Sequence, residues 1–180
     1  PGWVRAWDAR TGEHAWDFHT VPNSADEFGV DTWLNDSWRY TGNTGVWAQM
    51  TIDPELNMAY FAVEAPTGDY YGGHRPGNNL FAGSVVAVDL ETGERVWHYQ
   101  TVHHDIWDWD LPAAPVLLDI TVDGRAIKAL IQPTKQSYMF VLDRVTGEPI
   151  WPIEEREVAT DTDLEGELLS PPQPFPTRPP

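Results

Sequence analysis

Short apolar runs alternate with polar turn segments along the chain. The segment Asp-x-x-Thr-Gly-Glu-x-x-Trp occurs three times, beginning at Asp8, Asp89 and Asp143, and each copy lies between two such runs. The runs before the three copies are residues 3–7, 85–88 and 138–142, and those after them are residues 15–18, 96–99 and 150–153. Short β-rich runs joined by a tight Thr-Gly turn predict three strand–turn–strand hairpins.

Each copy of the repeat ends on a tryptophan, at Trp16, Trp97 and Trp151. A repeated unit cannot bury its hydrophobic face alone and has to stack on its neighbours. Three hairpins that share one Trp position therefore predict an all-β chain whose antiparallel sheets dock through that Trp. This is the arrangement of a β-propeller. The ten Trp, six Tyr and six Phe residues agree with a β-rich chain.

Further strands are expected between the repeats. Residues 49–63 predict two strands around a turn at residues 53–57. Residues 115–121 and 127–132 predict another hairpin, because Asp123-Gly124 lies between them. A closed propeller typically has about four to eight blades, so the chain is interpreted as an arc of one. Residues 1–157 are assigned to about three blades. Residues 158–180, acidic and then Pro-rich, are assigned to an extended segment that orders against a larger protein.

Composition narrows the function classes. The 11 basic and 28 acidic residues give a net charge of −17, which argues against a nucleic-acid partner. An acidic surface suits solubility or a basic protein partner. The chain has no cysteine, which excludes disulfides and thiolate metal sites. No apolar run approaches about 18 residues, so a transmembrane span is not expected.

The densest group of polar and aromatic residues lies at residues 103–110. Asp108 and Asp110 are two positions apart, so on an extended segment both carboxylates point to one face. Such carboxylates raise each other's pKa unless a cation lies between them, and calcium-like ions prefer oxygen ligands. The alternative is a polar loop whose Asp side chains cap turns while its Trp residues pack. His103 and His104 are adjacent and would point to opposite faces of a strand, which argues against a zinc site.

Several segments together resemble the pyrroloquinoline quinone (PQQ)-dependent dehydrogenases, which include quinoprotein alcohol and glucose dehydrogenases. They are the threefold repeat, Gly-Asn-Asn-Leu-Phe at 77–81, the run from Trp97 to Asp108 with its His-His-Asp-x-Trp-Asp, and residues 134–144. The resemblance implies an arc of an eight-bladed β-propeller that binds PQQ near its axis and oxidises an alcohol or aldose. It also implies cytochrome c or a membrane quinone as electron acceptor. The implied location is the periplasm, or the periplasmic side of a membrane.

The resemblance assigns roles to three residues. Trp47, just before the Asp-Pro-x-Leu-Asn turn at 53–57, matches the Trp on which the quinone stacks. Asp108 matches the general base that takes the hydroxyl proton as hydride moves to the quinone. Lys135 matches the basic residue that contacts the quinone oxygens. Read without the resemblance, Lys135 is an ordinary solvated lysine and Trp47 an ordinary core residue.

A divalent cation is also implied, with calcium expected and magnesium or a lanthanide as alternatives. Its ligands in this chain would be Asp108, Asp110 and Glu64. The chain departs from the family at Ala65, where relatives usually place a metal-binding Asn, so either Glu64 takes over as ligand or the cation is held differently. Asp110 does not by itself fix the metal. The rival hypothesis is a non-catalytic propeller that scaffolds other proteins.

Overall fold

The structure is a computed structural model that describes residues 2–178, and its regular structure is almost entirely β. The two exceptions among these residues are short 3₁₀ segments, η1 (Val30–Thr32) and η2 (Leu34–Arg39). The strands are β1 (Trp3–Trp7), β2 (His14–His19), β3 (Thr51–Asp53), β4 (Met58–Ala62), β5 (Ser84–Asp89), β6 (Arg95–Gln100), β7 (Val116–Val122), β8 (Arg125–Pro133), β9 (Met139–Asp143), β10 (Ile153–Glu157) and β11 (Pro172–Pro176). Within residues 2–178 no helix is long and apolar enough to cross a membrane. The prediction of an all-β chain is confirmed.

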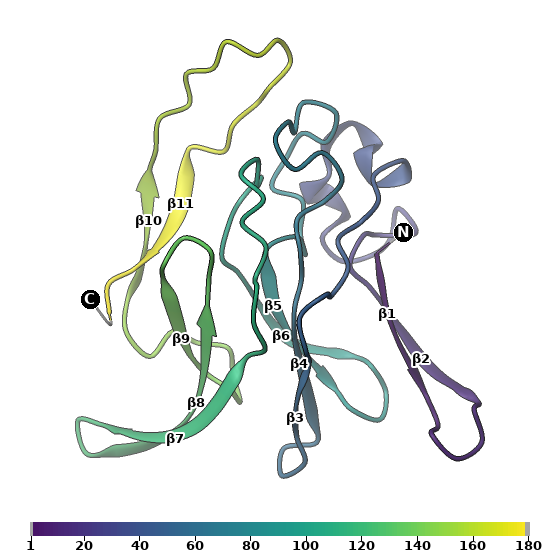
Figure 1. Cartoon of the computed structure of the whole chain (residues 1–180), viewed down its shortest axis with the longest axis vertical. Coiled ribbons are helices and arrows are strands. Elements are labelled where there is room, and N and C mark those ends of the chain that lie inside the picture. The colour runs from purple at the N-terminus through teal and green to yellow at the C-terminus, as the bar shows by residue number, and fades with distance from the viewer. Residues whose placement is uncertain (1, 179–180) are drawn as a thin grey trace.

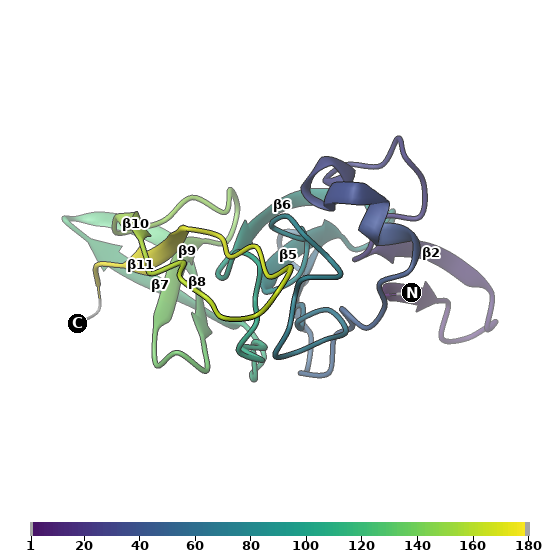
Figure 2. The same ribbon diagram turned by 90° about the horizontal axis from the view of Figure 1, so that it is seen from above.

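The strands form four antiparallel sheets that lie side by side (Figure 1). Their orders are β1-β2, β3-β4-β5-β6, β7-β8-β9 and β10-β11. The two-stranded β1-β2 sheet and the β10-β11 sheet lie at opposite ends of the row, also when it is seen from above (Figure 2). The most deeply buried strands, β4 and β5, are central in the four-stranded sheet, and their side chains supply both large hydrophobic clusters.

The three repeats fold the same turn with the same bonds. In each copy the Asp carboxylate accepts the backbone N–H groups two and three residues later, at 2.8–3.3 Å. In each copy the glycine N–H also bonds to the Asp carbonyl, and the glycine has a φ of 73–79°. Glycine takes this left-handed conformation without steric cost. These Asp residues therefore form turns.

Two of the repeat tryptophans bridge neighbouring sheets. The Trp16 indole donates to the carbonyl of Leu90 at 3.1 Å and covers Gly93 so closely that a Cβ there would lie 2.5 Å from the ring. Trp97 repeats this contact one sheet further on, donating to the carbonyl of Arg144 at 3.0 Å and covering Gly147. In both cases the Thr-Gly turn of one sheet receives the Trp of the sheet before it.

The prediction of a return strand at residues 150–153 in the third repeat is wrong. Leu142 pairs with Pro149 in an isolated bridge and Ile150 donates to Val141 at 3.0 Å, after which the pairing stops. Pro149 and Pro152 both lack the N–H that a ladder requires. The chain forms β10 from residue 153 instead and pairs it with β11.

The C-terminal segment turns back on the rest of the chain. The β10–β11 sheet spans the boundary assigned after residue 157, and the loop between these strands extends to the upper edge of Figure 1. Gln173 exchanges hydrogen bonds with the backbone of His103, at 3.0 and 2.8 Å. Residues 158–178 thus contact the loop that contains Asp108.

Candidate functional site

Lys135 brings together residues that are far apart in the sequence. It follows β8, and its ammonium group donates to the carbonyl oxygen of Asp108 at 2.8 Å and to its carboxylate at 3.2 Å. The same ammonium group lies 3.4 Å from the Asp110 carboxylate. It also lies 5.9 Å from the centre of the Trp47 ring, within the range of a cation–π contact. The structure therefore groups Trp47, Asp108, Asp110 and Lys135.

Glu64 belongs to the same group through two backbone contacts. Its carboxylate accepts the N–H of Gly45, two residues before Trp47, at 2.9 Å. The next residue, Ala65, donates its N–H to the Asp110 carboxylate at 2.6 Å. Residue 65 thus contributes its backbone N–H to the group, and its methyl side chain offers no metal ligand.

The loop around Asp108 is shaped by Asp105. The two carboxylate oxygens of Asp105 each accept one backbone N–H, from Trp107 and from Trp109, both at 2.8 Å. Asp108 lies between these two bonds with a φ of 55°. A positive φ is costly for most residues and is tolerated best by Asn and Asp, so the surrounding bonds hold Asp108 in an uncommon conformation.

The loop separates its acidic side chains from its indoles. Asp108 and Asp110 both reach Lys135. Trp107 and Trp109 stack on each other with ring centres 5.8 Å apart and an interplanar angle of 21°. The predicted common face of the two carboxylates is therefore observed, with an ammonium group as their partner.

The acidic groups of the site are electrostatically crowded. Burial raises the pKa of Glu64 above its ordinary value, and the nearby charges of Asp110, Asp69 and Asp108 raise it further. The pKa of Asp110 is also raised, mainly by burial and partly by Asp108, against the opposing effect of Lys135. Burial works against the charge of Lys135, but its bonds to the two Asp carboxylates raise its pKa. More negative charge than one lysine balances is concentrated here, a condition that favours a bound cation.

The described residues do not by themselves form a metal site. Across residues 2–178 no three or more His, Asp or Glu side chains are grouped closely enough to hold a metal ion. Asp108, Asp110 and Glu64 are oxygen donors of the type that calcium prefers, and a full coordination shell needs further ligands.

Trp47 has the surface that a planar ligand requires. It is 54% exposed, as Trp7 and Trp107 also are at 52% and 61%, and what distinguishes it is the Lys135 ammonium group 5.9 Å from its ring. A Trp normally buries most of its large apolar surface. An open indole beside an ammonium group fits a flat, anionic aromatic molecule.

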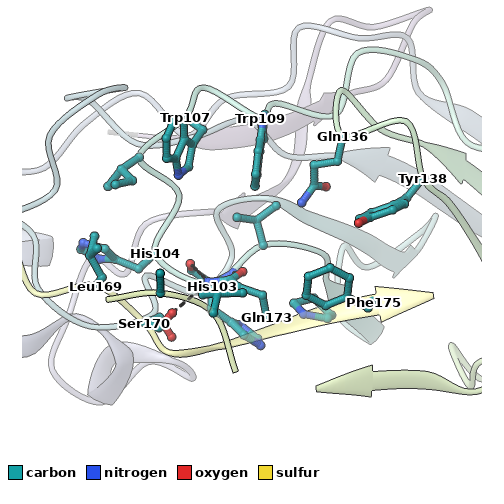
Figure 3. A pocket seen from close by; sticks show the side chains of 15 residues that line it. His103, His104, Trp107, Trp109, Gln136, Tyr138, Leu169, Ser170, Gln173 and Phe175 are labelled. Atoms are coloured by element: carbon teal, nitrogen blue, oxygen red, sulfur yellow. Dashed lines mark hydrogen bonds between the residues drawn. The ribbon is translucent and has the colours of Figure 1, made fainter. Parts of the chain in front are cut away.

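A cavity of about 490 Å³ lies on the indole side of the same loop. Figure 3 shows Trp107 and Trp109 on one side of it and His103 and Phe175 on the other. Its lining includes Gln136, next to Lys135, but not Lys135 or any of the three acidic residues of the site. The cavity is thus adjacent to the predicted site and separate from it.

Sequence reasoning missed the residues that support the loop. Arg75 is fully buried, and its guanidinium group donates to the carbonyl of Asp105 and to Asn79. Asp105 is 2% exposed, and burial raises its pKa to about 6. A charged residue is seldom fully buried without a structural role, but only the fold shows that Arg75 is buried.

Comparison with known proteins gives consistent results along the whole chain. The family model described as "PQQ: Glucose/ethanol/alcohol dehydrogenase, beta-propeller domain" matches residues 1–180. The quinoprotein glucose dehydrogenase of Escherichia coli (strain K12) is 38% identical over 176 residues, which are 97% of this chain and 21% of that protein. The chain therefore spans about a fifth of the length of this relative.

Solved structures give the same result. A quinohemoprotein alcohol dehydrogenase from Comamonas testosteroni matches with a TM-score of 0.77 and 27% identity, over 98% of this chain and 28% of that one. A quinohemoprotein alcohol dehydrogenase from Pseudomonas putida HK5 matches with a TM-score of 0.74 and 34% identity, over 88% of this chain and 25% of that one.

Proposed function

The chain belongs to the β-propeller family of PQQ-dependent glucose, ethanol and alcohol dehydrogenases, and from this premise we propose that the protein containing it oxidises an alcohol or aldose at the Trp47–Asp108–Lys135 site. The observation that carries the proposal is the position of the Lys135 ammonium group, within 3.4 Å of two carboxylates and 5.9 Å from the Trp47 ring. This convergence places two carboxylates, an ammonium group and an exposed indole together, which are the groups that proton abstraction and stacking of a flat cofactor require.

The residues have distinct tasks in this proposal. Asp108 accepts the hydroxyl proton of the substrate, and the ammonium group of Lys135, 3.2 Å from its carboxylate, holds that carboxylate in place. Trp47 provides the flat surface on which the cofactor stacks, an interaction of about 0.5–1.5 kcal/mol beyond area burial. Lys135 also supplies fixed positive charge toward the cofactor oxygens. When bound, PQQ supplies the hydride acceptor, which protein side chains cannot provide.

A divalent cation is part of the proposal. Asp108, Asp110 and Glu64 would hold it, together with ligands from the rest of the protein, and calcium suits these oxygen donors best. The raised pKa values of Glu64 and Asp110 support a cation here, because positive charge would relieve their repulsion. When bound, such an ion would supply Lewis-acid chemistry to the site.

The proposal also covers the architecture of the whole protein. We propose that the four sheets are an arc of an eight-bladed propeller in which each repeat Trp docks on the following blade. Trp16 and Trp97 already make this contact. The electron acceptor would be cytochrome c or a membrane quinone, and the location the periplasm or the periplasmic side of a membrane.

The test is Asp108→Asn in the full-length protein, with PQQ and calcium added. We expect the variant to bind the quinone as the wild type does and to lose turnover with dye acceptors, because an amide cannot take the substrate proton. Undiminished turnover would refute the assignment of Asp108 as the base.

A further inference from the structure

A buried pair of polar side chains connects the C-terminal segment to the loop that contains Asp108. Glu167 lies in the loop between β10 and β11, and its side chain is completely buried. One carboxylate oxygen lies 3.0 Å from Nε2 of His104, and the other accepts the N–H of Gly72 at 2.9 Å. The packing is close, since a Cβ on Gly72 would lie 2.4 Å from the His104 ring.

Both ring nitrogens of His104 are held by hydrogen-bonding partners. Nδ1 of His104 is 2.8 Å from the carbonyl oxygen of Gly77, which can only accept, so Nδ1 carries a proton. Nε2 faces a carboxylate oxygen of Glu167 at 3.0 Å, so both ring nitrogens contact oxygen atoms. Replacing the carboxylate by an amide removes the negative charge and turns one acceptor into a donor, so the amide can still accept the N–H of Gly72 but keeps its contact with His104 only if Nε2 carries no proton.

His104 directly precedes Asp105, the residue that shapes the loop containing Asp108. It has a φ of 48°, and the next residue, Asp105, holds the backbone on both sides of Asp108 through its bonds to Trp107 and Trp109. A shift of His104 therefore moves Asp105 and, with it, the position of Asp108. Such a buried network fixes geometry when all its members are paired.

We propose that Glu167 is a positioning residue for Asp108, acting through His104. The inference rests on the proposed function, because it concerns the placement of the base assigned there. It gives the segment after residue 157 a role in turnover.

The test compares Glu167→Gln with Glu165→Gln in the full-length protein loaded with PQQ and calcium. Glu165 lies in the same loop and is exposed, which makes it the matched control. For Glu167→Gln we expect kcat to fall about 10- to 100-fold at unchanged quinone content, because displacement of a catalytic group by about 1 Å is that costly. For Glu165→Gln we expect kcat to stay at the wild-type value.

Two results would overturn the inference. The first is an unchanged kcat in Glu167→Gln, and the second is a loss of activity that only parallels loss of bound quinone. If Glu167→Gln does not fold, kcat and quinone content are measured instead for Glu167→Asp, which keeps the charge but shortens the side chain. Full turnover in Asp108→Asn would instead refute the proposed function, so the two failures are distinguishable.

Discussion

Replacing Gly93 by alanine tests how the sheets are joined. Gly93 has a φ of 73°, and a Cβ built on it would lie 2.5 Å from the Trp16 ring. Gly12 occupies the same place in the first repeat with a φ of 74°, but a Cβ there would meet nothing within 4 Å. The two glycines therefore differ in the contact with Trp16 and not in backbone conformation.

The expected magnitudes follow from this difference. Alanine in the left-handed region costs about 1–2 kcal/mol, and both variants incur that cost. Overpacking against a ring typically costs a further 1–3 kcal/mol or so, which only Gly93→Ala incurs, since Trp16 is 9% exposed and cannot move away freely. We expect Gly93→Ala to lower the free energy of unfolding by about 1–3 kcal/mol more than Gly12→Ala.

The assay is urea denaturation of the 180-residue chain, followed by tryptophan fluorescence. In a Trp16→Leu background the excess cost of Gly93→Ala should disappear, because the shorter side chain leaves room for the methyl group. Equal losses for Gly93→Ala and Gly12→Ala, or an excess that survives Trp16→Leu, would refute the reasoning.

Two further predictions concern buried charge. Arg144 joins the second and third sheets through a 2.7 Å ion pair with the buried Asp53, so Arg144→Met should lower the free energy of unfolding by about 3–5 kcal/mol, and chemical denaturation would measure the loss. Asp105 should destabilise the fold as pH rises from about 4 to 6, because its pKa is about 6 in the folded state and 3.8 ordinarily. The contribution of protonated Asp105 to the free energy of unfolding is fully present below pH 3.8, the ordinary pKa. It falls by up to about 3 kcal/mol once the pH exceeds the folded-state pKa. Denaturation curves across this pH range should show that slope in the wild type and lack it in Asp105→Asn.

The parts of the fold that the sequence predicted are those encoded locally. The hairpins around Asp8 and Asp89 form because a carboxylate caps two N–H groups and a glycine takes a positive φ, all within five residues. The Asp123-Gly124 hairpin has φ values of 50° and 78°, as a two-residue type I′ turn requires at both central positions. Pro149 and Pro152 were also visible in the sequence, and they would have argued against the return strand at 150–153.

The residues of the candidate site, unlike the hairpins, could not be predicted from local patterns. Trp47, Asp108 and Lys135 came from a resemblance, since neither periodicity nor charge distinguishes them from a core indole and solvated side chains. Their supports were missed because they act over long distances in the sequence. Glu167 bonds to a histidine 63 residues away, and the bond from Arg75 to Asp105 spans 30 residues. Only the folded chain brings such pairs together.

The most direct test of the central claim is a titration of the full-length protein with PQQ in the presence of calcium, followed by absorbance and tryptophan fluorescence. Trp47→Leu is compared with Trp7→Leu, a control at a position that is 52% exposed in this chain. We predict that the wild type and Trp7→Leu acquire a bound chromophore with equal affinity, and that Trp47→Leu binds about tenfold more weakly. A wild type that binds no quinone, or a Trp47→Leu variant that binds it as tightly as the control, would contradict the account.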